Sequence, residues 1–265
     1  MAKLLPNFMF IGSMSNISAY KRHDSDKIIL RTKGGPSKHK IKTSPSFEVL
    51  RKRNKEFGGR SAASARLLLP LEYLKPITDY NIAGPLNSLL RPIQELDTDN
   101  EKGRRHVLIS RNPRLLEGFN LNKRHPFDWM VRNPVDWSIA KETFSARIEF
   151  PALIPGINFS LPDGHFPVYQ LVAVLAVIPD MFHGEVRYKP LPEFDDASVI
   201  RIESDWFPIS AGSAAQMLNL QLPQMTLPGS FSLMLAAGIS FGRFNAMGGV
   251  DPAKYIGCAK IVGMV

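Results

Sequence analysis

The sequence predicts an α+β protein: an N-terminal β-hairpin with helices, followed by a mainly antiparallel β-sandwich or barrel-like domain. Three observations support this class. Positive charge is concentrated in the first quarter, helix-start signals precede residue 100, and from about Val135 short apolar runs alternate with Pro and Gly. A length of 265 residues allows one large or two modest domains. We therefore predict a basic region over residues 1–134 and a β-domain over residues 135–265.

The first predicted element is a β-hairpin over residues 10–33. Residues 10–20 and 27–33 are two strand-forming runs, and the polar segment 21–26 between them is rich in turn residues. Gly and Pro in residues 34–37 end the second run. Because an isolated hairpin is only marginally stable, we expect it to pack on the body, on a neighbour or on a ligand.

A helix-start signal follows at Ser44-Pro45. Ser44 suits the N-cap, Pro45 suits the first helical position, and Glu48 favours the positive end of the helix. Apolar residues at helical spacing then form one stripe: Phe47, Leu50 and Phe57. Gly58-Gly59 predicts a break, after which residues 62–69 restart the helix.

Less regular structure is expected between this helix and the β-domain. A second helix is predicted over residues 85–96, because Pro85 follows Gly84 at its start. Residues 97–105 are polar and indicate a loop. Residues 106–134 contain Asn-Pro at 112–113 and 133–134, which favours turns in an irregular bridge.

The C-terminal half is predicted to be made of short strands. Its apolar runs are separated by turn residues and helix signals are nearly absent, which is typical of an antiparallel sandwich or barrel. The six predicted strands are residues 144–150, 169–178, 199–202, 217–222, 231–241 and 255–265. The last two are apolar and nearly uncharged, so we expect them to offer sheet edges for strand addition.

The charge distribution points to a binding partner rather than to a reaction. Residues 1–66 hold 15 Lys and Arg against four acids, a net charge of +11, whereas residues 135–265 hold eight against 12, a net charge of −4. Such a basic segment attracts phosphates, acidic lipids or acidic protein surfaces, including those of another copy. The alternative is a solvated face that keeps a basic protein soluble. The candidate contacts for a phosphate or an acidic partner are Lys21, Arg22, Lys33, Lys38, Lys40, Lys42, Arg51, Lys52, Arg53, Lys55 and Arg60.

Motifs for catalysis and metal binding are weak. Neither a Walker-type phosphate loop nor a Gly-x-Ser-x-Gly elbow occurs. Asp163 and His165 are separated from Asp180 and His183 by a predicted strand of about 11 residues, roughly 35 Å long, so the two pairs are not expected to share a site. We therefore expect no catalytic residue, no metal site and no cofactor.

Three further groups of residues are interpreted as structural. Cys258, the single cysteine, is expected to be a small packed hydrophobe. The acidic residues Glu193, Asp195, Asp196, Glu203 and Asp205 are expected to form a solvated loop rather than a calcium site. The tryptophans are expected in the core or at an interface: Trp129, Trp137 and Trp206.

The sequence favours a cytoplasmic location. No apolar stretch approaches the roughly 20 residues of a membrane-spanning helix. Pro6 and Asn7 interrupt the short apolar run at the start, which makes it a poor secretory signal.

Parts of residues 10–100 resemble a protein family of Bacteroidetes. The resemblance lies in residues 16–21, 28–38 and 43–61, and in the run Tyr-Asn-Ile-Ala-Gly-Pro-Leu at 80–86. Members of that family pair a Gly-containing N-terminal hairpin with a basic Thr/Ser-Pro helix, ahead of a β-rich half. The resemblance implies the two-part architecture and a bacterial source, and it transfers no catalytic residue.

Three functions are compatible with these observations. The leading one is a non-enzymatic structural or assembly protein that associates with itself or with a partner protein, because a hairpin that needs a partner and a charge-polarised chain suit head-to-tail contacts. The second is sequence-independent nucleic-acid binding through residues 20–66. The third is an enzyme or ligand-binding β-domain whose site leaves no motif in the sequence.

Overall fold

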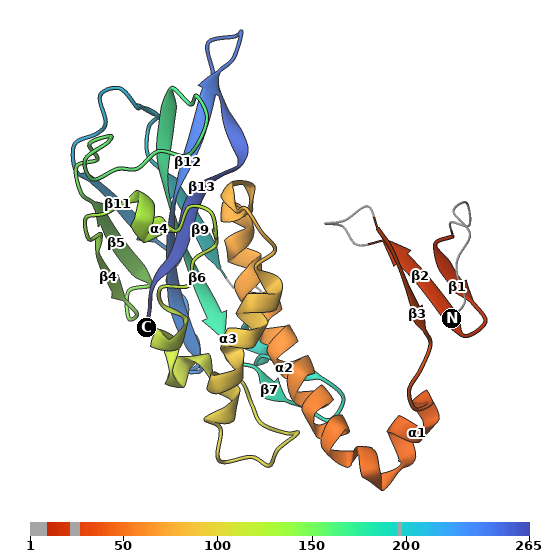
Figure 1. Cartoon of the computed structure of the whole chain (residues 1–265). Helices are drawn as coiled ribbons and strands as arrows, with labels where there is room; N and C mark the ends of the chain where they lie inside the picture. The colour runs from red at the N-terminus through yellow and green to blue at the C-terminus, as the bar shows by residue number, and fades with distance from the viewer. Residues whose placement is uncertain (1–9, 22–26, 195–197) are drawn as a thin grey trace. The chain divides into compact units, whose positions relative to one another are not determined.

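The computed structural model describes residues 10–21, 27–194 and 198–265 (Figure 1). The chain divides into two compact units, Met1–Arg51 and Lys52–Val265. The predicted α+β class is confirmed, with many antiparallel strands in several sheets. The division at residue 51 does not coincide with the expected boundary at residue 134, because the helices after residue 51 pack on the sheet of the C-terminal half.

The N-terminal unit contains a three-stranded antiparallel sheet rather than a two-stranded hairpin. Its strands are β1 (Gly12–Met14), β2 (Ile17–Lys21) and β3 (Ile28–Thr32), with β2 in the centre. The predicted first run, residues 10–20, is split by a two-residue turn in which Ser15 has a φ of 50°. Most of the predicted turn at residues 21–26 lies outside the described residues.

Two short helices follow this sheet. Helix α1 (Lys38–Thr43) was not predicted, and the hydroxyl of Ser37 caps it by accepting a hydrogen bond from the backbone N–H of Lys40. Ser44-Pro45 does begin a helix, first as the 3₁₀ turn η1 (Pro45–Phe47) and then as the long helix α2 (Glu48–Leu71).

Helix α2 runs without interruption through Gly58-Gly59, so the predicted break is wrong. The buried face of the helix also differs from the predicted stripe: Leu50 and Phe57 are exposed, whereas Ala63 and Leu67 are fully buried. The apolar residues at 47, 50 and 57 therefore do not mark the side on which α2 packs. Tertiary contacts from Glu56 onward select that side.

The connection from α2 to the β-strands is built of short helical turns around one regular helix. The predicted second helix is confirmed as α3 (Ala83–Glu95), and residues 97–105 form a loop as expected. The remaining elements are η2 (Glu72–Ile77), η3 (Ile109–Arg111), η4 (Pro113–Leu116) and α4 (Phe127–Met130). The irregular character predicted for residues 106–134 is thus observed.

Two sheets form the C-terminal half, and all six predicted strands are present. A five-stranded antiparallel sheet has the order β10-β6-β12-β13, with β9 also paired to β6, and a three-stranded sheet has the order β11-β5-β4. A small β7-β8 hairpin lies apart from both. The strands and the last 3₁₀ turn are β4 (Asp136–Ala140), β5 (Ser145–Phe150), β6 (Val168–Pro179), β7 (Phe182–His183), β8 (Tyr188–Lys189), η5 (Pro192–Phe194), β9 (Val199–Glu203), β10 (Phe207–Pro208), β11 (Gln216–Gln221), β12 (Phe231–Phe244) and β13 (Val250–Met264).

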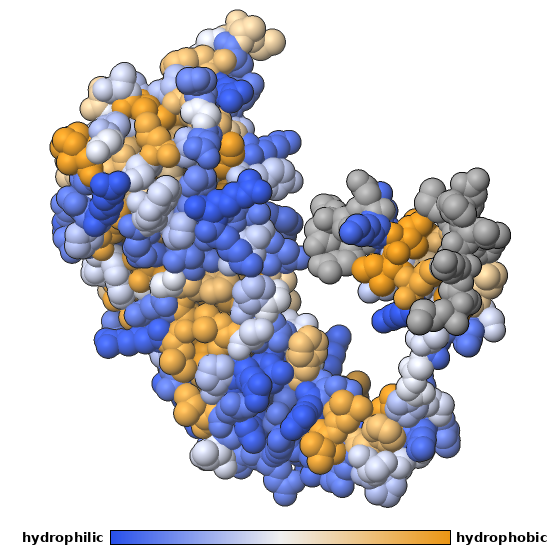
Figure 2. All heavy atoms as spheres, viewed as in Figure 1, coloured by the Kyte–Doolittle hydropathy of each residue, from blue (hydrophilic) through white to orange (hydrophobic). Residues whose placement is uncertain are grey.

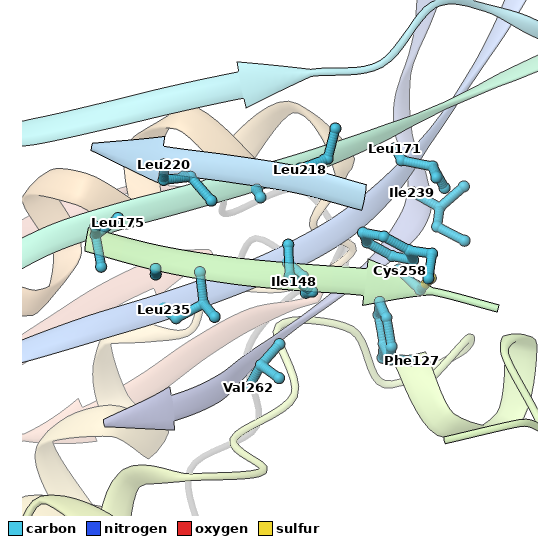
Figure 3. Packing of buried hydrophobic residues seen from close by; sticks show 14 of the residues in the cluster. Phe127, Ile148, Leu171, Leu175, Leu218, Leu220, Leu235, Ile239, Cys258 and Val262 are labelled. Carbon is cyan, nitrogen blue, oxygen red and sulfur yellow. The ribbon is translucent and has the colours of Figure 1, made fainter. Parts of the chain in front are cut away.

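Strands β6 and β12 are apolar throughout because both faces of the large sheet are covered. On β6, Leu171, Leu175 and the other odd-numbered residues face the small sheet, and Figure 3 shows them packed with Ile148 and Leu218. The even-numbered residues of β6 from Val172 to Ile178 join the side chains of α2 and α3 in a second core. The second unit therefore has three layers: helices, large sheet and small sheet.

The expectation of free sheet edges at residues 231–241 and 255–265 is wrong. Strand β12 lies between β6 and β13, so both of its sides are paired. The outer side of β13 is bonded by the bridging segment, since the N–H groups of Gly118 and Leu121 donate to Ile261 and Ala259 at 2.8 Å. Hydrogen bonding of this kind protects a strand from pairing with another chain.

Cys258 is a buried member of the core between the two sheets, as predicted (Figure 3). Burial raises the pKa of its thiol far above the ordinary value. Within the described residues, no helix has both the length and the apolar character required to cross a lipid bilayer.

Candidate functional site

The predicted basic contacts are divided between the two units. In the N-terminal unit, Lys21 ends β2, Lys33 directly follows β3, and all three lysines of α1 are exposed; these are Lys38, Lys40 and Lys42. Arg22 lies outside the described residues. This unit therefore carries a dispersed basic surface.

Arg51 has a structural role at the end of the N-terminal unit. Its Nη1 donates hydrogen bonds of 2.8 Å to the carbonyl oxygens of Ile41 and Ser44. These carbonyls lie at the C-terminal end of α1, where backbone acceptors lack helical partners and a cation is favourable. The guanidinium of Arg51 is thus used in holding α1 against the start of α2.

Helix α2 brings two of the predicted basic residues into one cavity of about 240 Å³. Arg53 and Arg60 lie seven residues apart, which places them on the same face of the helix. The cavity lies between α2, α3 and the loop after α3, and its lining consists of Arg53, Glu56, Arg60, Arg91, Glu95 and Lys102. Lys52 and Lys55 of the same helix do not line it.

The floor of this cavity is the buried carboxylate of Glu56. Glu56 Oε1 accepts a hydrogen bond of 2.9 Å from the backbone N–H of Gly103 and lies 3.5 Å from Nε of Arg105. Gly103 has a φ of +95°, and a β-carbon there would lie 2.9 Å from the side chain of Lys52. A glycine is therefore needed for the loop to approach α2 closely enough to bind Glu56.

Buried polar groups behind Glu56 are connected by hydrogen bonds. Gln94 of α3 accepts a 2.8 Å hydrogen bond from Arg60 Nη1 and donates one of 3.1 Å to the carbonyl oxygen of Arg105. The hydroxyl of Tyr188 donates a 2.8 Å hydrogen bond to the same carbonyl. Burial, with the nearby charge of Glu56, raises the pKa of Tyr188 to about 12, so this hydroxyl remains a donor at neutral pH.

Asp97 orders the loop that carries Gly103 and Arg105. Its carboxylate accepts hydrogen bonds from the backbone N–H groups of His106, at 2.6 Å, and Asp99, at 3.1 Å, and from the side chain of Asn100. Although burial acts to raise it, the pKa of Asp97 is lowered by these hydrogen bonds. The ionised carboxylate therefore fixes the loop at neutral pH.

The cavity offers positive charge and many hydrogen-bond donors. Its lining side chains are four cations and two carboxylates, and both carboxylates are already paired with arginines. Outside the cavity, His183 has its pKa lowered by burial and then by nearby charges such as that of Lys55. Binding of an anion is the chemistry that this arrangement supports.

The two Asp/His pairs considered from the sequence lie at opposite ends of β6. At one end, Arg243 donates to the carbonyl of His165; at the other, Asp180 accepts hydrogen bonds from Ser110, with the N–H at 2.8 Å. The backbone N–H of His183 donates to Nδ1 of His106. Within the described part of the chain, no three His, Cys, Asp or Glu side chains are grouped so as to hold a metal ion.

The tryptophans differ in their burial. Trp129 is 56% exposed, so it is not a core residue, and it stacks on His125 at a ring distance of 5.9 Å. Trp137 packs its ring on Gly263 of β13, and Trp206 packs on Gly242 of β12. Of the acidic group at 193–205, Asp195 and Asp196 lie outside the described residues, and Glu203 pairs with Arg201.

Sequence reasoning did not identify Arg91, Glu95 and Lys102 as members of the cavity. The only local signal was the spacing of Arg91 and Glu95, which form an i,i+4 ion pair of 2.8 Å on α3. Pairing of α3 with α2 is a tertiary contact that this spacing does not report. Comparisons with protein-family models, with curated proteins and with solved structures found no match to this chain.

Proposed function

We propose that this chain is a non-enzymatic assembly protein whose N-terminal sheet packs on a second copy of the same chain. The supporting observation is an apolar sheet face whose side chains are almost all exposed or half-buried. In the antiparallel register, Met14 is opposite Ile17, and Ala19 is opposite Leu30. Cross-strand partners project on the same side of a sheet, so these residues share one face, which Ile28 joins opposite Lys21.

The burial of the N-terminal unit is too small for independent stability. Among residues 10–21 and 27–51, Ala19 is the only buried residue, whereas Met14 is 52% and Leu30 is 40% exposed. Figure 2 shows apolar residues at the surface of this unit. Ordering a residue costs about 1–2 kcal/mol of conformational entropy. Three short strands with a single buried residue among those described do not offset this cost. A further apolar surface is required.

Charge supports a second copy as the partner. The N-terminal unit, residues 1–51, has ten basic and three acidic residues, a net charge of +7, and residues 135–265 have a net charge of −4. Two N-terminal units repel each other, whereas an N-terminal unit and the β-rich half of another copy attract each other. A contact between different surfaces of identical chains is heterologous, and it generates rings or filaments.

The test measures mass by size-exclusion chromatography with light scattering at low and high salt. We expect species larger than a monomer at low salt, and a smaller fraction of them at high salt. We expect Leu30→Asp to shift the population to the monomer. Ile29→Asp is the matched control because residue 29 lies on the opposite face of β3. A monomer under every condition, or an assembly that Leu30→Asp leaves unchanged, contradicts the proposal.

Sequence-independent nucleic-acid binding through residues 20–66 is the second candidate. The observation that favours it is the exposed basic helix α1, with three lysines in six residues. Phosphate contacts of this kind weaken steeply with salt. Filter binding of mixed DNA and RNA tests it, and an affinity unchanged by removal of the three α1 charges (K38Q/K40Q/K42Q) contradicts it.

A further inference from the structure

The cavity between α2 and α3 has an excess of positive charge that its own carboxylates do not balance. Both carboxylates are already engaged, Glu56 with Arg105 and Glu95 with Arg91. In the described part of the chain, Arg53 and Lys102 have no carboxylate within 4.0 Å. Two cations at the rim therefore remain available to an incoming anion.

Arg60 provides a second, independent indication that the cavity can accept an anion. Its Nη1 is bonded to Gln94, but its Nε is buried and has no hydrogen-bond partner among the described residues. Burial lowers the pKa of Arg60, and the positive charge of Arg91 also lowers it. The carboxylates of Glu56 and Glu95 act to raise it. A guanidinium stays charged in proteins, so a buried donor without an acceptor is unfavourable. The cavity that Arg60 lines therefore has a positive charge whose hydrogen bonding is incomplete.

The size of the cavity restricts the ligand. A volume of about 240 Å³ is below the range of about 300–1,000 Å³ typical of pockets for drug-sized molecules. The lining is polar and cationic rather than apolar, so an organic body would have little to pack against. A single tetrahedral oxyanion fits within this volume, and its oxygens suit the fork geometry of the arginine donors.

We propose that this cavity binds a phosphate group, with Arg53, Arg60 and Lys102 as the contacting side chains. The phosphate belongs either to a free ion or to the backbone of a nucleic acid, and both present the same oxygens to the site. The proposal is independent of the assembly through the N-terminal sheet, because every lining residue belongs to the second unit.

The test compares two double variants with equal loss of charge. Arg53→Gln with Lys102→Gln removes two lining cations, and Arg114→Gln with Lys254→Gln removes two exposed cations that do not line the cavity. Arg53 and Lys102 are exposed and take part in no ion pair in the described structure, so the fold is expected to remain intact, which circular dichroism checks. Calorimetric titration measures binding of inorganic phosphate and, separately, of a short single-stranded DNA.

We expect the unmodified protein and the Arg114/Lys254 variant to bind inorganic phosphate with the same affinity. We expect the Arg53/Lys102 variant to bind it at least about tenfold more weakly. If that variant weakens DNA binding to the same extent and phosphate competes with DNA, the source is a nucleic-acid backbone. If DNA binding is unchanged, the source is a free phosphate. Equal losses in both double variants, or no phosphate binding at all, overturn the proposal.

Discussion

The ring of Tyr188 lies directly against the backbone of Gly59, so that a β-carbon at Gly59 would come within 2.6 Å of two ring carbons. Tyr188 belongs to the small hairpin β7-β8, far along the chain from α2. The contact explains why α2 contains a glycine at a buried position, and why Gly58-Gly59 does not break the helix. Burial of the ring compensates for the low helix propensity of glycine.

The adjacent glycines provide a matched pair of substitutions. Gly59→Ala forces the Tyr188 ring to move, and we expect it to lower the free energy of unfolding by about 1–3 kcal/mol. Gly58→Ala meets no atom within 4 Å, and we expect it to raise that free energy by about 0.5–1 kcal/mol because alanine favours the helix. Urea unfolding midpoints measure both; a stabilising Gly59→Ala would contradict the contact.

The two carboxylates of the cavity are expected to differ in their effect on stability. Glu56 is buried and accepts the N–H of Gly103, whereas the side chain of Glu95 is 49% exposed. Glu56→Gln weakens a buried charged hydrogen bond, and we expect a loss of about 1–3 kcal/mol in the free energy of unfolding. For Glu95→Gln we expect little change, since exposed ion pairs are weak.

A double-mutant cycle assigns the partner of Glu56. If the loss arises through Arg105, Glu56→Gln costs less stability in an Arg105→Gln background than in the unmodified chain. Strict additivity of the two substitutions would show that Gly103, rather than Arg105, accounts for the effect of Glu56.

Asp180 is expected to make stability depend on pH. Burial raises its pKa above the ordinary value of 3.8, although the hydrogen bonds from Ser110 act in the opposite direction. As pH rises above 3.8, the carboxyl ionises first in the unfolded chain, so the folded state binds more protons and its relative stability falls. The unfavourable contribution is complete above the pKa of the folded state.

Asp180→Asn removes this contribution. We expect the stability of the variant, relative to the unmodified protein, to increase between about pH 4 and pH 7, as measured by urea unfolding at each pH. Asp99→Asn, an exposed position, controls for the change in net charge. A stability difference for Asp180→Asn that is constant over this range would show that ionisation of the buried carboxyl is not involved.

Cys258 is expected to be chemically silent in the native protein. It is fully buried between the two sheets, and burial raises the pKa of its thiol, which leaves almost no reactive thiolate. A thiol reagent at mildly alkaline pH is predicted to label less than a tenth of the native protein in the time that labels it fully in denaturant. Rapid labelling of the native protein would mean that β13 does not pack as observed.

Local patterns were sufficient to predict most elements of this fold. Continuous apolar runs mark β6 and β12 because both faces of the sheet are covered, and Ser44-Pro45 marks the helix start because the signal is local. The prediction of a break at Gly58-Gly59 was wrong because the ring that packs on Gly59 belongs to Tyr188, which is distant in the sequence. Likewise, the edge of β13 is covered by a segment more than 130 residues earlier.

The candidate site was likewise predictable from the sequence only in its local features. Composition and local signals predicted the excess of basic residues and the place of Arg53 on a helix. Arg60 shares a face with Arg53 because α2 continues through Gly58-Gly59, which the sequence did not predict. Packing determines which cations join Arg91 and Lys102 around the cavity, and which, like Arg51, cap a helix. The physical reason is that charge and periodicity are local properties of a chain, whereas a cavity is formed by side chains that packing brings together from separate elements.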